Sequence, residues 1–79
     1  MWTLYYAQQV VSTIYQLREK GVALREELKR LEQDPHMSDA RVIPDQANMY
    51  EIEVLGYWVL FELLEKQQAI RVLNIDEVM

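Results

Sequence analysis

The hydrophobic positions of this chain form two long runs separated by a short polar break. In the first run, apolar residues recur every three or four positions, which places them on one stripe of an α-helix, as in a coiled coil. The stripe consists of Ala7, Val10, Ile14, Leu17, Gly21, Leu24, Leu28 and Leu31. It predicts a long helix over about 3–33, in which Gly21 permits a close backbone approach or a slight bend.

The second run centres on Val54–Leu64, where every residue except Glu62 is apolar, aromatic or glycine. Asp45 precedes it and is a good helix cap, because its carboxylate accepts hydrogen bonds from the free amides of a first turn. We therefore predict a second helix over about 45–73, followed by a short tail. A helix that is apolar on all sides needs cover on all sides, and one neighbouring helix supplies only part of it.

Asp34-Pro35 lies between the runs and ends the first helix, because proline disfavours the helical conformation of the residue before it. We expect a loop over 34–44. The 79 residues include two glycines and two prolines, which favours long helices over many short strands. The predicted fold is all-α: one domain over 1–79, built as a helical hairpin of two long antiparallel helices.

A lone hairpin of this size buries too little apolar surface to be stable. We expect two hairpins to pair into a four-helix bundle homodimer, with a domain-swapped rod or a larger protein partner as alternatives. Tyrosine and tryptophan anchor such interfaces. The predicted interface residues are Trp2, Tyr5, Tyr6, Val10, Ile14, Leu17, Tyr57, Trp58, Phe61 and Leu64, and Val11 and Tyr15 widen the same stripe.

The formal net charge is −5, and the basic residues between Arg18 and Arg30 are interleaved with glutamates. Mixed charge along a helix is typical of a solvated face and argues against nucleic-acid binding. An acidic, dimeric, nucleic-acid-associated regulator using Arg18–Arg30 remains an alternative. Neither the uncharged segment 1–17 nor Val54–Leu64 has the length of a membrane span, so we expect an intracellular protein away from membranes.

No catalytic or metal-binding motif is present in the sequence. There is no cysteine, and His36 is the single histidine, in the predicted loop. Di-metal bundles use Glu-x-x-His on their helices, and the predicted helices contain no histidine. We therefore expect no catalytic residue, no metal and no cofactor, and hence no enzyme.

The segment around the second run resembles one helix of the GANP-type mRNA-export scaffold family. The pattern is carried by Glu53, Gly56, Tyr57, Val59, Leu60 and Leu63, with Arg41–Asp45 similar to the preceding loop. Val54 departs from the phenylalanine of that family. The resemblance implies a helical piece of a nuclear scaffold that docks other proteins.

Together these observations predict a non-catalytic protein-interaction module, such as a small regulator, adaptor or inhibitor, that acts through helix packing and self-association. The scaffold fragment and the nucleic-acid-associated regulator are the alternatives. The identity of the partner does not follow from the sequence.

Overall fold

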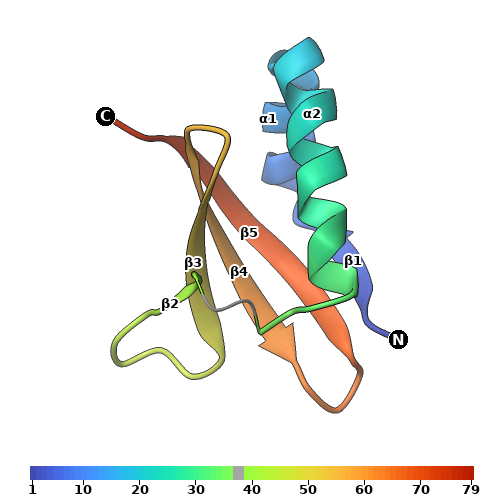
Figure 1. Ribbon diagram of the computed structural model, residues 1–79, viewed down its shortest axis with the longest axis vertical. Coiled ribbons are helices and arrows are strands. Elements are labelled where there is room, and N and C mark those ends of the chain that lie inside the picture. Colours follow the sequence, from blue (N-terminus) through green and yellow to red (C-terminus); the bar gives the residue numbers. More distant parts are fainter. Residues whose placement is uncertain (37–38) are drawn as a thin grey trace.

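The computed structural model describes residues 1–36 and 39–79, and within them a mixed sheet carries two helices on one face (Figure 1). The elements follow one another as β1 (Thr3–Tyr6), α1 (Gln8–Gln16), α2 (Glu19–Leu28), the 3-10 turn η1 (Lys29–Glu32), β2 (Arg41–Val42), β3 (Met49–Val54), β4 (Tyr57–Leu64) and β5 (Ala69–Glu77). The strand order is β1-β5-β4-β3-β2, with β1 parallel to β5 and the remaining neighbours antiparallel. The fold is α/β, so the prediction of an all-α hairpin is wrong.

The second hydrophobic run folds as strands rather than as a helix over about 45–73. Along β4, buried Val59, Phe61 and Leu63 alternate with half-buried residues, which is the two-residue period of a strand. Its β-branched Val59 and its three aromatic side chains also pack well on a pleated surface. Leu55 and Gly56, with φ of 51° and 85°, form the two-residue turn between β3 and β4. Asp45 caps no helix and lies in the loop before β3.

The first run is helical, but it does not form one rod over 3–33. Residues 3–6 form β1, and the helix is interrupted at Leu17 and Arg18. Arg18 has a φ of 55°, so the chain turns back there and α2 packs against α1. The predicted stripe does face the core: its buried members include Val10, Ile14, Leu24, Leu28 and Leu31.

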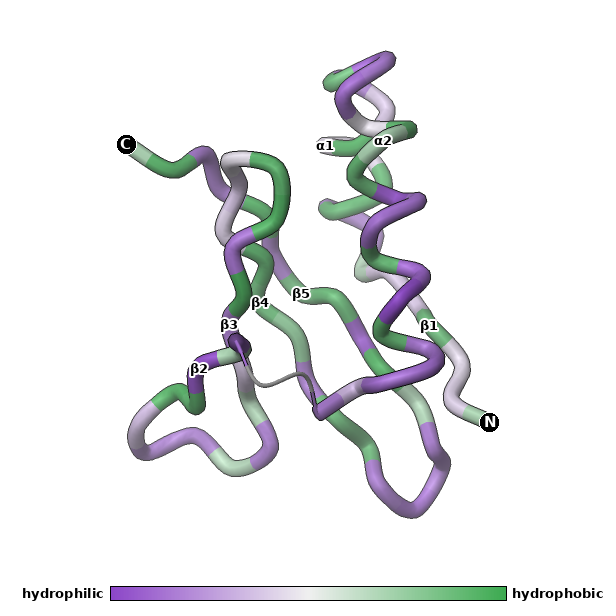
Figure 2. Tube along the Cα trace, viewed as in Figure 1, coloured by the Kyte–Doolittle hydropathy of each residue, from purple (hydrophilic) through white to green (hydrophobic). Residues whose placement is uncertain are grey.

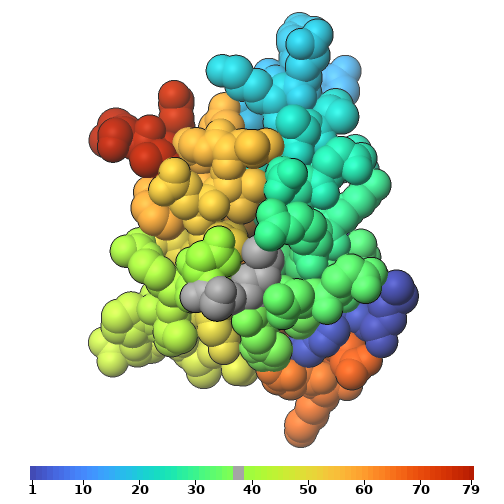
Figure 3. Space-filling view, viewed as in Figure 1, coloured from blue at the N-terminus to red at the C-terminus, as the bar shows by residue number. Residues whose placement is uncertain are grey.

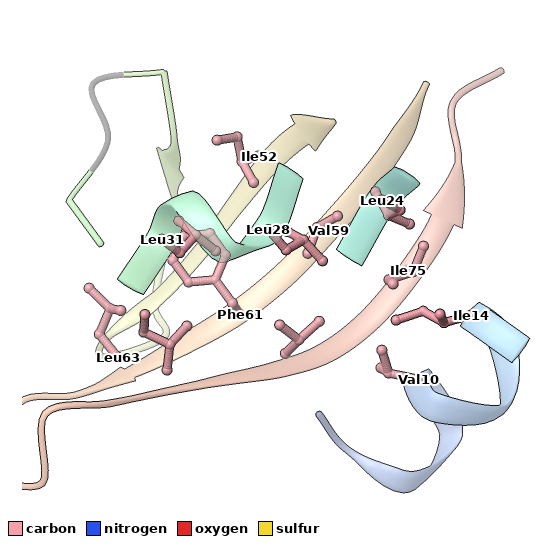
Figure 4. Packing of buried hydrophobic residues seen from close by; sticks show 12 residues of the cluster. Val10, Ile14, Leu24, Leu28, Leu31, Ile52, Val59, Phe61, Leu63 and Ile75 are labelled. Carbon is pink, nitrogen blue, oxygen red and sulfur yellow. The ribbon is translucent and has the colours of Figure 1, made fainter. Parts of the chain in front are cut away.

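The core lies between the helices and the sheet (Figure 4). Phe61 in the middle of β4 has an exposed fraction of 0%. Tyr50 of β3 stacks on it, with ring centroids 5.7 Å apart. Opposite Phe61, a register shift against β5 is absorbed between Val72 and Asn74. This one layer of helix on one layer of sheet buries the apolar face of each.

The helices of the described residues have nine and ten residues. The four-helix bundle and the domain-swapped rod therefore cannot form, because both require two long helices. No helix in the part of the chain that the structure describes is long and apolar enough to cross a membrane.

Replacing Gly21 with alanine should destabilise the protein, although alanine is the better helix former. A β-carbon at Gly21 would lie 2.0 Å from the carbonyl oxygen of Ile14, so α2 would have to move away from α1. Such overpacking costs roughly 1–3 kcal/mol, whereas helix propensity alone favours alanine by about 1 kcal/mol. Urea denaturation measures the free energy of unfolding. The exposed Val22→Ala on the same helix is the control, and a more stable Gly21→Ala would contradict the packing of α1 on α2.

Candidate functional site

The sheet face that points away from the helices is covered by no helix of the described residues. Because cross-strand partners share a face, the strand register places a set of side chains together there. We call this set the uncovered sheet face: Thr3, Tyr5, Arg41, Met49, Glu51, Glu53, Trp58, Leu60, Glu62, Leu64, Ala69, Arg71, Asn74 and Asp76. Carboxylates outnumber arginines on it, and Trp58, Leu60 and Leu64 are half-buried.

Both arginines of the uncovered sheet face are held by cross-strand carboxylates. The Nη2 of Arg71 lies 3.1 Å from Oε1 of Glu62, its register partner. Arg41 pairs in the same way with Glu51, and its guanidinium lies 4.7 Å from the centroid of the Trp58 ring. An anion that approaches this face therefore has to displace a carboxylate from an arginine.

A second surface, which we call the helical groove, lies between the end of β1 and the two helices. It encloses about 650 Å³. Its lining residues are Tyr6, Val11, Ile14, Tyr15, Arg18, Glu19, Val22 and Arg25. In the space-filling view the helices occupy the upper right of the molecule, with the N-terminal residues and the turn between β4 and β5 below them, and the segments of β2 and β3 lie on the left (Figure 3).

Tyr6 is half-buried where β1 meets the helical groove. Burial raises the pKa of its phenol above the ordinary value of 10.0, because a phenolate would lose solvation there. The positive charge of Arg25 lowers the pKa of Tyr6 and offsets part of this effect, while Glu32 raises it. At neutral pH the phenol of Tyr6 is therefore uncharged, and the charge of Arg25 acts on it.

The single histidine lies in an aromatic row rather than in a catalytic cluster. His36 contacts Trp2 and Tyr50 edge-on, with centroids 6.0 and 6.5 Å away, and Tyr50 stacks on Phe61. Nε2 of His36 lies 3.3 Å from a carboxylate oxygen of Glu65. Among residues 1–36 and 39–79, no group of three potential metal ligands gathers.

The structure distributes the residues of the sequence-predicted interface over several places. Val10, Ile14 and Phe61 are buried in the core, and Ile14 also reaches the helical groove beside Tyr6. Trp2, Leu17 and Tyr57 pack against the core from its edge. Tyr5, Trp58 and Leu64 lie on the uncovered sheet face, where Tyr5 is the register partner of Arg71. Whether these residues contact a partner stays a prediction.

Sequence reasoning missed the arginine pairs of the uncovered sheet face. The prediction left Arg41 in a loop and put Glu62 and Arg71 on one helix, nine residues apart and so on opposite sides. Strand register instead sets Arg41 beside Glu51 and Glu62 beside Arg71. In the helical groove, the sequence pattern indicated Val11 and Tyr15, which widen the apolar stripe of the first run. Val22 and Arg25 carried no such signal, because they join the groove only once the chain reverses at Arg18.

No protein-family model matches the sequence, and no curated protein does either. Solved structures do match. The isolated RelE toxin of E. coli superposes with a TM-score of 0.83 at 12% identity, covering 100% of this chain and 86% of the toxin. The intact E. coli RelBE toxin-antitoxin complex gives 0.82 at 12% identity, covering 100% of this chain and 99% of the matched one. The Pyrococcus horikoshii RelE-RelB complex gives 0.79 at 18% identity, covering 96% and 93%.

These matches establish that the chain has the fold of RelE toxins, and they overturn several expectations. The resemblance to a GANP-type scaffold is wrong, because the segment that carried it forms β3 and β4. The module acting through helix packing and self-association, the scaffold fragment and the regulator using Arg18–Arg30 are not supported. The expectation that the protein is not an enzyme fits poorly with its structural similarity to toxins. Those neighbours form complexes with antitoxins, whereas a homodimer is not shown. The intracellular location stays a prediction.

Replacing Tyr6 with phenylalanine should make the protein more resistant to alkaline pH. Because the pKa of Tyr6 is raised in the folded state, its contribution to stability is full below pH 10.0 and is lost as the pH rises through the folded-state pKa. Above pH 10.0 the wild type should lose free energy of unfolding relative to Tyr6→Phe. Urea denaturation across the alkaline range measures this, with Tyr5→Phe as the exposed control. Parallel curves for wild type and Tyr6→Phe would contradict the burial of the phenol.

Proposed function

We propose that this chain is a RelE-type toxin and that a protein antitoxin holds it in a complex. The observation that carries the proposal is the match over the whole length: all of the chain superposes on the isolated E. coli toxin with a TM-score of 0.83. The fold is therefore shared as a complete unit rather than as a common supersecondary motif. Fold alone does not imply activity. The proposal therefore also needs one surface that contacts the target of the toxin and another that binds the antitoxin.

The uncovered sheet face is the proposed acting surface. It combines a tryptophan that stacks with a guanidinium and two arginines fixed across strands. The side chains of Arg41 and Arg71 are 65% and 53% exposed, whereas those of their partners Glu51 and Glu62 are 24% exposed. An anionic group of a target can therefore reach each guanidinium from solvent and compete with the carboxylate that pairs with it.

The proposed antitoxin follows from what the matched structures contain. The E. coli and Pyrococcus horikoshii chains were solved in complex with RelB, and another E. coli structure holds an antitoxin peptide. For this chain, the helical groove offers a surface for a protein partner on the helical side of the molecule. The toxin's acting surface and the surface that is held can therefore be tested separately.

Expression of the chain from a tightly repressed promoter in E. coli should arrest growth on induction. The double variant Arg41→Ala/Arg71→Ala should relieve the arrest, because it removes both cations of the uncovered sheet face. The matched control is Lys29→Ala/Arg30→Ala, which removes two exposed cations that are likewise paired with glutamates, on η1. This control should still arrest growth. Colony formation and optical density are the measurements.

Circular dichroism and soluble yield must show that each variant is folded before its growth effect is read. A soluble, folded wild type that leaves growth unchanged would overturn the proposed function. If both double variants relieved the growth arrest equally, the uncovered sheet face would not be the surface that contacts the target.

A further inference from the structure

We infer that the uncovered sheet face receives a segment of a protein rather than a nucleic acid. This segment presents a basic side chain to one end of the face and an acidic side chain to the other. The inference deepens the proposed function, on which it rests in taking this face to contact the target, and it names the class of the target. Three features of the face lead to it: its balance of charge, the different chemistry of its two ends and its apolar middle.

The balance of charge on the uncovered sheet face disfavours a nucleic acid. Glu51 and Glu62 pair with its two arginines, whereas Glu53 and Asp76 make no ion pair within residues 1–36 and 39–79. Asn74 donates a hydrogen bond of 2.7 Å to Asp76, which holds this carboxylate without removing its charge. Nucleic-acid binders neutralise phosphates with a basic surface. A face with surplus carboxylates, on a chain with a net charge of −5, repels phosphates instead.

The end of the face beside the turn between β3 and β4 selects a basic side chain. Strand register places Trp58 there, with Glu53 on one side and Asp76 on the other. Both carboxylates are exposed. The Trp58 ring already contacts a guanidinium, that of Arg41, as expected from the attraction of cations to an aromatic face. Because Glu51 neutralises Arg41, the other two carboxylates are left for a lysine or arginine of the target.

The end of the face beside the turn between β4 and β5 selects an acidic side chain. Arg71 lies there between Glu62 of β4 and Tyr5 of β1. Its side chain is 53% exposed and that of Glu62 is 24% exposed, so the guanidinium is the charged group that an approaching side chain reaches first. Tyr5 is exposed, and its phenol can donate a hydrogen bond. A carboxylate of the target can accept from both groups, and guanidinium matches carboxylate geometry well.

An apolar middle separates the two ends. Trp58 and Glu62, which mark the ends on β4, are four residues apart, or roughly 13 Å at 3.3 Å per residue of strand. Leu60 lies half-buried between them. Figure 2 shows polar residues at intervals along β5, which is otherwise hydrophobic. A protein segment can place an apolar residue between opposite charges at this spacing, whereas a nucleic acid carries a negative charge at every phosphate.

A second copy of this chain is a poorer occupant. In a twofold-symmetric contact the face would meet itself, so the surplus carboxylates of both copies would be buried together. The net charge of −5 on each copy adds repulsion. A target segment with a basic side chain removes the surplus and favours specific encounter.

The first test uses growth arrest and separates the two classes of target by the sign of the effect. Glu53→Gln/Asp76→Asn removes two negative charges from the face. It should relieve the arrest, because the basic side chain of a protein target loses its partners. A nucleic-acid target would bind this variant at least as well as the wild type, so the arrest would persist or deepen. The matched control is Glu26→Gln/Glu27→Gln, which removes two exposed carboxylates on α2 and should still arrest growth.

The second test measures binding to the purified, folded, full-length chain and does not depend on growth. Random peptides of about twelve residues, long enough to reach both ends of the face, are displayed and selected against it. Selected peptides should carry Lys or Arg on one side of an apolar residue and Asp or Glu on the other. A synthetic selected peptide should bind Glu53→Gln/Asp76→Asn about tenfold more weakly than the wild type, and Glu26→Gln/Glu27→Gln equally well. The NMR shift of the Trp58 indole on peptide addition locates the site.

Fluorescence anisotropy with a single-stranded RNA of about 20 nucleotides is the opposing measurement, and the wild type should not bind it. RNA binding that weakens steeply with salt and is lost in Arg41→Ala/Arg71→Ala would overturn the inference. So would growth arrest that persists in Glu53→Gln/Asp76→Asn, selected peptides without a basic residue, or no enrichment at all. A wild type that selects such peptides but leaves growth unchanged would sink the proposed function alone, so the two can fail separately.

Discussion

The burial of β4 on its helix-facing side is the constraint on which the rest of the structure depends. Val59, Phe61 and Leu63 have exposed fractions of 0% and lie on the central strand of the sheet, between β3 and β5. On that face α2 and η1 supply Leu24, Leu28 and Leu31 to the same core cluster. Truncating a buried phenylalanine typically costs about 3–5 kcal/mol, which is a large share of the stability of so small a domain.

The same constraint creates the two candidate surfaces. Because strand side chains alternate, burying one face of β4 turns Trp58, Leu60 and Glu62 to the other face, where no helix of the described residues covers them. On the helical side, the short hairpin of α1 and α2 buries one side of each helix. Val11, Tyr15 and Val22 are left outside on the other. The two surfaces therefore lie on different layers and can contact different molecules.

Electrostatics separates the two surfaces further. On the sheet, strand register pairs each arginine with a carboxylate, so the surface is polar but compensated. At the helical groove, the chain reversal presents Arg18 without such a partner among the described residues. An acidic chain with the fold of RelE toxins thus places Arg18 beside the exposed apolar side chains of Val11, Tyr15 and Val22.

The sequence by itself determined the apolar stripe of the first run, because three- and four-residue spacing has one structural meaning: Val10, Ile14, Leu24 and Leu28 face the core as the spacing predicts. It also marked Gly21 as a point of either close approach or a bend, and the structure shows a close approach to Ile14. It did not determine the sheet, because a continuous apolar run satisfies a buried helix and a central strand equally. Tertiary structure decided between them by placing helices over one face of β4. It also decided both candidate surfaces, since the arginine pairs depend on strand register and the groove depends on the reversal at Arg18, and neither is a property of neighbouring residues along the chain.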